Sequence, residues 1–196
     1  NSNPKNPVIG IRSYGEKADL VANLGSWYVR GQQEMGVAAV AKHFPGHGDT
    51  HSDSHFSMPS IDADRARLSK VELKPFKRAV ESGLDAIMTA HIALPRISEE
   101  PDLPATLSKN IIDGLLRKQL GYDGLVLTDG LEMQAIVQSY GSGTAAVMAI
   151  QAGADMPMIL WTADKQREVY SGIIQAVKDG RISQKRLDQS VRRILE

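Results

Sequence analysis

Two hydrophobic patterns alternate along the chain: short continuous apolar runs, and longer segments in which apolar residues recur every three to four positions. The helical pattern predicts helices over residues 17–35, 69–82, 108–120, 143–152, 165–179 and 183–195. The continuous pattern predicts buried strands over residues 37–41, 85–90, 124–128 and 155–160. This alternation predicts an α/β fold in which helices cover a parallel sheet.

Local signals set the helix boundaries. Ser69 followed by Glu72 has the pattern of a capping box, although Pro75 lies inside the same predicted helix. Ser183 has the position of a cap for the last helix, and Gly153 ends the fourth.

Polar side chains follow three of the predicted strands at the point where each ends. Lys42 and His43 follow the first strand, His91 the second and Asp129 the third. Sites in parallel α/β folds form where strands end, so these residues are expected at one edge, as in a barrel enzyme. A full (β/α)8 TIM barrel needs about 250 residues. Four strands cannot close such a barrel, so we expect an open sheet or part of a larger molecule.

Composition removes several classes of function. The chain has 196 residues, with 23 basic and 23 acidic side chains, and this zero net charge gives no reason to expect nucleic acid as a partner. It has no cysteine, which excludes disulfide scaffolds, thiolate metal sites and cysteine nucleophiles. No run of about 18 apolar residues is present, so no membrane-spanning segment is expected. The cellular compartment stays unknown.

Four of the five histidines lie in one segment, at positions 43, 47, 51 and 55. On a helix, this spacing would form a one-sided metal ladder, but Pro45, Gly46 and Gly48 argue against a helix there. A zinc site and a loop whose histidines only make structural hydrogen bonds are both kept as alternatives.

Asp53 and His55 form a sharper pair within this segment. Residues two apart in an extended chain point the same way, so the carboxylate can orient the imidazole as it does beside a histidine base. Asp129 alone would be interpreted as a helix cap, but beside a His–Asp pair it becomes a candidate nucleophile or metal ligand. Glu132 is expected to face solvent or to cap a helix.

The motifs resemble family 3 glycoside hydrolases, in particular their β-N-acetylglucosaminidase branch. The resemblance rests on the run from Lys42 to Thr50 (Lys-His-Phe-Pro-Gly-His-Gly-Asp-Thr), on the triplet 53–55, and on segments 10–16, 88–91 and 128–133. It extends nearly end to end, with the motifs in the family's order. One departure is Gly130 after Asp129, where the family commonly has Asp or Ala.

The resemblance implies a role for each matching residue. Asp129 would be the catalytic nucleophile, and His55 the general acid/base with Asp53 as its partner. The sugar would be held by residues of the substrate-binding subsite: Arg12, Lys42, His43 and His91. The substrate would be a glycan with terminal β-linked N-acetylglucosamine, from peptidoglycan or chitin. No metal and no cofactor are implied.

The resemblance also implies that residues 1–196 form the C-terminal portion of a single TIM-barrel catalytic domain. The family's first strands are missing from this chain, so we expect them in a separate chain or in a segment outside this sequence. Two rival functions are kept: a metal-dependent hydrolase that uses the histidine-rich loop, and a sugar-binding half-barrel without activity.

Overall fold

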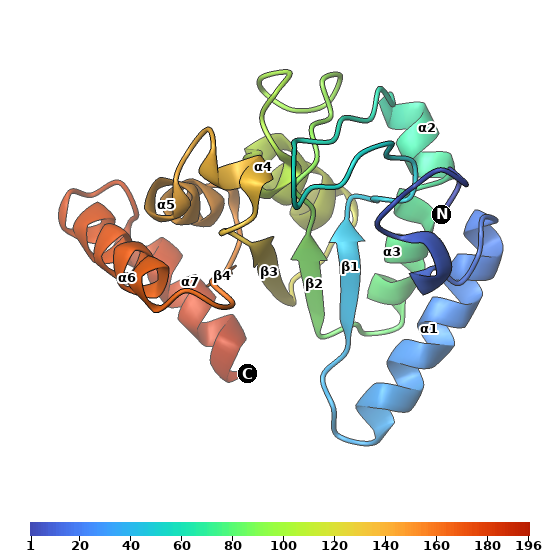
Figure 1. The fold of residues 1–196 in the computed structure, drawn as a ribbon. Coiled ribbons are helices and arrows are strands. Elements are labelled where there is room, and N and C mark those ends of the chain that lie inside the picture. Colours follow the sequence, from blue (N-terminus) through green and yellow to red (C-terminus); the bar gives the residue numbers. More distant parts are fainter.

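A computed structural model describes all residues, 1–196, and contains a four-stranded parallel sheet with helices packed against it (Figure 1). The strands are β1 (Val40–Phe44), β2 (Ala86–Thr89), β3 (Leu125–Gly130) and β4 (Met156–Met158). Their order in the sheet equals their order in the chain. The predicted α/β fold with about four parallel strands is therefore confirmed.

Helices connect the strands and close the chain. The bounds are α1 (Ala18–Glu34), α2 (Arg65–Lys70), α3 (Leu73–Glu81), η3 (Asn110–Gln119), α4 (Gln134–Val137), α5 (Ser142–Ala152), α6 (Ala163–Lys178) and α7 (Gln184–Leu195), with short 3₁₀ turns η1 (Gly10–Arg12) and η2 (Ala105–Leu107). Figure 1 shows α1 and α3 beside β1, and α5, α6 and α7 on the far side of β3. No helix is both long and apolar enough to cross a membrane.

Two predicted boundaries are wrong. The first strand begins at Val40 instead of residue 37. The polar site residues Lys42 and His43 lie within the strand rather than after it. The predicted helix 69–82 is two helices, and α2 is capped by Asp64, whose Oδ1 accepts a hydrogen bond from the Arg67 backbone N–H at 2.8 Å. Glu72 closes no capping box.

The last helix follows its sequence signals. The Ser183 hydroxyl accepts a hydrogen bond from the backbone N–H of Arg186, as a helix N-cap does. Pro75 is tolerated because it is the third residue of α3, in the first turn, where a missing N–H breaks no intrahelical bond.

The two faces of the sheet differ in burial. Ile87 and Val126 are fully buried in the main hydrophobic core, on the face that the helices cover. On the other face, Val40 is 41% exposed, and Met88 and Met156 are only partly buried. A sheet with one covered and one uncovered apolar face is what a part of a barrel presents, because the inner face of a barrel is filled by side chains from all strands.

A buried carboxylate fastens the amino ends of the last strands to the helices. Asp155, directly before β4, has a fully buried side chain that accepts hydrogen bonds from Arg117 at 2.6 Å and from Arg186 and Arg193 at 3.2 Å each. The Ser190 hydroxyl adds a fourth contact at 3.0 Å. Since these donors lie on η3 and α7, one carboxylate holds both helices against the sheet.

Replacing Asp155 by Asn should lower the free energy of unfolding by about 3–5 kcal/mol, because three partly buried guanidinium groups lose their counter-charge. The matched control is Asp123→Asn, whose carboxylate is 89% exposed and pairs only with Arg193. It should cost less than about 1 kcal/mol. Urea unfolding of the full-length protein measures both, and equal losses would contradict this account of the Asp155 cluster.

Candidate functional site

An irregularity at the end of β1 presents two consecutive residues to the site. Lys42 pairs with Met88 of β2, but Phe44 pairs with Thr89, so His43 is an extra residue in the ladder. Extra residues of this kind redirect side chains near active sites. Lys42 is exposed on the uncovered side, whereas His43 is buried and lies close to β3.

Asp129 lies near the end of β3, where the register with β4 also shifts. Its Oδ1 accepts a hydrogen bond from the Gly130 backbone N–H at 2.8 Å, and its Oδ2 lies 3.5 Å from Nε2 of His43. The shifted ladder is completed by the Thr128 hydroxyl, which accepts from the Met158 N–H at 2.9 Å. The carboxylate thus has one tethered oxygen and one oxygen directed at His43 of β1, two strands away in the sheet, and it caps no helix.

His43 is neutral beside this carboxylate. Burial lowers its pKa to about 3, and the nearby Asp129 charge offsets that effect only in part. Burial likewise lowers the pKa of His47. The site therefore places uncharged imidazoles next to Asp129, and these can donate or accept hydrogen bonds without forming a full ion pair.

Asp53 and His55 form the pair that the sequence predicts, although the backbone between them has a different conformation from the one predicted. The segment turns at Asp53, whose Oδ1 accepts from the His55 backbone N–H at 2.9 Å and from its Nδ1 at 2.7 Å. This is an Asx-type turn rather than the extended chain that we expected. Partial burial acts to raise the pKa of Asp53, but the hydrogen bonds from His55 hold it below its usual value.

This contact fixes the tautomer of His55. A carboxylate can only accept here, so Nδ1 carries a proton, and Nε2 is the nitrogen that can exchange one. The imidazole is 54% exposed, so Nε2 is accessible to a bound molecule.

Buried hydrogen bonds hold the loop that carries this pair. His47 contacts the Thr50 hydroxyl through Nδ1 at 2.8 Å and the Ser54 hydroxyl through Nε2 at 3.3 Å. The Ser54 carbonyl accepts from the Ala135 N–H at 3.4 Å, which connects the loop to α4, the helix that follows Asp129. A main-chain hydrogen bond therefore connects the loop that carries His55 to the helix that follows Asp129.

Two asparagines at the start of the chain support the same loop, and sequence reasoning missed them. Asn6 donates to the His47 carbonyl at 2.7 Å and to the Thr50 hydroxyl at 3.2 Å, and Asn3 donates to the Thr50 carbonyl at 3.0 Å. Each precedes a proline, a turn signal that predicts a loop but not its partner.

An ion-pair cluster clamps the base of the loop from α2 and α3. Arg67 donates to Glu72 at 2.9 Å and to Asp49 at 3.1 Å. Burial raises the pKa of Glu72 even though Arg67 opposes this. Gly46 packs directly on Glu72: a Cβ there would lie 2.8 Å from the Glu72 Cβ, so only glycine fits.

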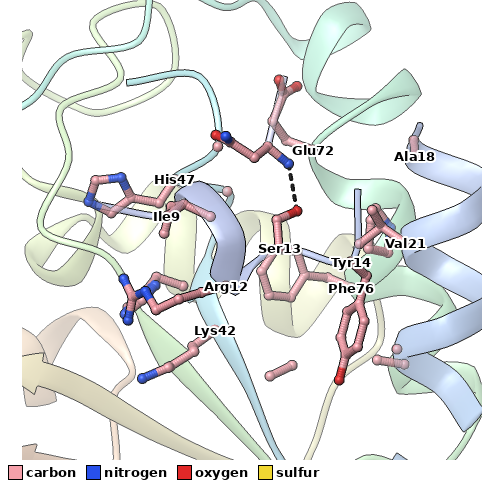
Figure 2. A pocket seen from close by; sticks show the side chains of 18 of the residues that line it. Ile9, Arg12, Ser13, Tyr14, Ala18, Val21, Lys42, His47, Glu72 and Phe76 are labelled. Carbon is pink, nitrogen blue, oxygen red and sulfur yellow. Dashed lines mark hydrogen bonds between the residues drawn. The ribbon is translucent and has the colours of Figure 1, made fainter. Parts of the chain in front are cut away.

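A cavity of about 460 Å³ opens beside β1 and the N-terminal segment. Figure 2 shows Arg12, Lys42 and His47 on one side of it, and Tyr14 and Phe76 on the other. Arg12 comes from η1 and is exposed, with its Nε donating to the Val8 carbonyl at 3.0 Å. The residues that line the cavity therefore include Arg12, Lys42 and His43, whereas Asp129, Asp53 and His55 lie outside it.

His91 has a different environment from the one expected. It has no exposed surface, contrary to the expectation that it contacts the sugar. Its ring nitrogens contact the Thr106 hydroxyl and the Gly130 carbonyl, each at 2.9 Å.

The four loop histidines do not converge. His43 and His47 are buried, His51 and His55 are exposed, and the segment between Pro45 and His55 is not helical. No three side chains among His, Asp and Glu lie where they could hold one metal ion. The geometry does not fit the metal-ladder alternative.

Glu132 makes no capping hydrogen bond to the N–H groups of a helix, one of the two roles expected of it, but holds the segment that precedes α6. Its carboxylate accepts from the backbone N–H groups of Leu160, Trp161 and Thr162, at 2.8 to 3.1 Å, directly before α6. Burial acts to raise its pKa, but these hydrogen bonds hold the pKa below its usual value.

A family model described as the glycosyl hydrolase family 3 N-terminal domain matches residues 1–196. The chain belongs to glycosyl hydrolase family 3. Its four parallel strands with their helices are consistent with part of the TIM barrel of that domain.

Solved structures of this family have the same fold over the whole chain. A family 3 β-N-acetylglucosaminidase from Paenibacillus sp. str. FPU-7 is 53% identical, with a TM-score of 0.98, and the match covers 100% of this chain and 37% of that one. The β-N-acetylglucosaminidase from Thermotoga maritima is 32% identical with a TM-score of 0.86, covering 95% of this chain and 40% of that one.

Curated relatives carry a related name. Beta-hexosaminidase A of Pseudoalteromonas piscicida is 37% identical over 210 residues, covering 99% of this chain and 35% of the relative. A beta-hexosaminidase of Nitrosomonas eutropha is 35% identical over 188 residues, covering 94% of this chain and 53% of the relative. The chain therefore spans about a third to a half of the length of these two family members.

The neutral state of His43 predicts a pH dependence of stability. In the unfolded chain, His43 takes up a proton near pH 6.5, whereas in the folded chain it does so only at about pH 3. Stability is therefore lost as the pH falls from about 6.5 toward about 3. In His43→Asn, this slope should be smaller by up to about 1.4 kcal/mol per pH unit. Urea unfolding of both forms at several pH values measures the slopes, and identical slopes would contradict a neutral His43.

Proposed function

We propose that the protein is a retaining glycosidase that removes terminal β-linked N-acetylglucosamine from glycans. One observation carries the proposal: an accessible His55, oriented by Asp53, lies on a loop tied through Ser54 and Ala135 to the segment after the Asp129 carboxylate. Membership of family 3, and relatives named β-N-acetylglucosaminidase, support the same reaction class.

In the first step, Asp129 attacks the anomeric carbon. An Asp129 carboxylate oxygen forms a bond to that carbon as the glycosidic C–O bond breaks, and Nε2–H of His55 gives its proton to the leaving oxygen. The Asp53 carboxylate stabilises the imidazolium before the transfer through its contact with Nδ1. The products are a glycosyl-aspartate and the free aglycone.

In the second step, His55 acts in the opposite sense. Its neutral Nε2 takes a proton from water as the water oxygen bonds to the anomeric carbon, and the bond to Asp129 breaks with its electron pair returning to the carboxylate. A free histidine has a pKa of about 6.5, so an imidazole can supply the acid in one step and the base in the other near neutral pH.

The cavity wall formed by Arg12, Lys42 and His43 is proposed to bind the sugar hydroxyls. Arg12 and Lys42 offer charged donors at the edge of the cavity, and neutral His43, which also lines it, lies 3.5 Å from the Asp129 carboxylate. Peptidoglycan fragments and chitin oligosaccharides both end in the sugar that this subsite would accept.

We infer further that residues 1–196 form the C-terminal portion of one TIM-barrel domain. The uncovered apolar face of the sheet and the share of the family members' length that the chain spans support this inference. The remaining strands, in the same or a separate chain, would cover the face that bears Val40 and Met88.

Asp129→Asn should lower kcat on an aryl N-acetyl-β-glucosaminide by at least about a thousandfold, because an amide cannot form the glycosyl-enzyme. The matched control is Glu132→Gln, a neighbouring carboxylate engaged with the backbone of residues 160–162, which should keep most of the activity. Steady-state kinetics on the full-length protein decide this. Unchanged turnover in Asp129→Asn would refute the nucleophile assignment.

His55→Ala should lose activity according to the leaving group. We expect a loss of about a hundredfold or more with an alkyl leaving group, which needs a proton, and of less than about tenfold in the glycosylation step with a dinitrophenyl group. The ratio of kcat/KM for the two substrates measures this. Equal losses on both would show that His55 is not the acid.

A further inference from the structure

His91 is fully buried between the ends of β2 and β3, and neither the reaction steps nor the sugar subsite uses it. It bridges three segments of the chain. Nε2 lies 2.9 Å from the Gly130 carbonyl oxygen, Nδ1 lies 2.9 Å from the Thr106 hydroxyl in η2, and that hydroxyl lies 2.9 Å from the Thr89 hydroxyl in β2.

The partners of His91 determine where its proton lies. A carbonyl oxygen can only accept, so Nε2 must carry the hydrogen that meets Gly130. Burial lowers the pKa of His91 and keeps the ring neutral, so Nδ1 is left as an acceptor. The Thr106 hydroxyl lies 2.9 Å from Nδ1 and 2.9 Å from the Ala90 carbonyl oxygen, so its single proton is shared between these two acceptors.

Gly130 is held at both of its main-chain groups. Its carbonyl accepts from His91, and its N–H donates to Oδ1 of Asp129 at 2.8 Å. A shift or rotation of the segment that holds Gly130 would therefore also move the carboxylate. The residue is packed as well, since a Cβ at Gly130 would lie 3.2 Å from the Leu160 side chain.

We propose that His91 is a positioning residue for the nucleophile: its Nε2–H holds the Gly130 carbonyl, and the Thr106 hydroxyl contacts Nδ1 on the other side of the ring. The inference rests on the proposed role of Asp129. The contacts run from Thr106 through His91 to Gly130. They end at the carbonyl of the residue whose N–H tethers the attacking carboxylate.

The tautomer can be observed without any substrate. Long-range ¹H–¹⁵N correlation spectra of the ¹⁵N-histidine-labelled full-length protein should show His91 as the neutral Nε2–H form from about pH 6.5 to about pH 8, because burial lowers its pKa. The signal is assigned by its loss in His91→Gln. A neutral Nδ1–H form, or an imidazolium in this range, would overturn the proposal.

Two substitutions separate positioning from folding. Gln can place an N–H near the position of Nε2, whereas Asn reaches only as far as Nδ1. His91→Gln should therefore keep kcat within about fivefold, and His91→Asn should lower kcat more than about fiftyfold, with KM changed less than about threefold in both. Equal losses in the two variants, or full activity in His91→Asn, would overturn the proposal.

Two substitutions at Thr106 provide a second test if His91→Asn does not fold. Thr106→Ser keeps the donor to Nδ1 and should match the parent protein, whereas Thr106→Val removes it. Thr106→Val should lower kcat about tenfold or more and slow labelling of Asp129 by a mechanism-based fluorosugar by a similar factor. If Thr106→Val behaves like Thr106→Ser in both measurements, the contact of Thr106 with His91 has no part in positioning the nucleophile, and the proposal is overturned.

The two proposals fail in different ways. Activity in Asp129→Asn would refute the nucleophile but would leave the His91 tautomer as measured. A wrong tautomer, or a fully active His91→Asn, would refute the positioning role while the requirement for Asp129 remains.

Discussion

The direction of the four strands is the constraint on which the rest of the structure depends. Because all four run parallel, every strand ends at the same edge, and each connection must cross back through a helical segment. Residues far apart in sequence, such as His43, His91 and Asp129, are brought to that edge by this geometry alone. The irregular register at the ends of β1 and β3 then sets the directions of the side chains. Lys42 is exposed, His43 is buried, and Asp129 faces His43.

The burial of polar groups determines how the loops at this edge of the sheet are held. Each buried polar group at this edge needs a partner, so the long loop after β1 is held by hydrogen bonds rather than by regular secondary structure. His47, Thr50, Ser54 and Asn6 satisfy one another there, and the same principle directs His91 to Gly130. Burial also keeps His43 uncharged, which lets it lie beside a carboxylate without a strong ion pair. The exposed His55 is the one imidazole of the site that is free to exchange a proton with a bound molecule.

The sequence predicts the strands and long helices because their apolar patterns are dictated by burial against one core. It places β1 too early because the apolar run begins at Val37 and is broken by Lys42 and His43, which belong to the strand. It starts a helix inside α2 because Ser69 and Glu72 imitate a capping box. The pairing of Asp53 with His55 follows from their spacing, although the turn that makes it does not. The burial of His91 and the contacts of Asn6 with His47 depend on long-range packing, and no local pattern contains that information.

The central claim is that the Asp129 carboxylate forms the covalent bond to the sugar. The most direct test is to inactivate the full-length protein with a mechanism-based fluorosugar derived from N-acetylglucosamine and to locate the label by peptide mass spectrometry. The account predicts a single glycosyl group on the peptide that contains Asp129, attached at that residue. A label on Asp53, on Glu132 or on another carboxylate, or continued turnover with no label at all, would contradict it.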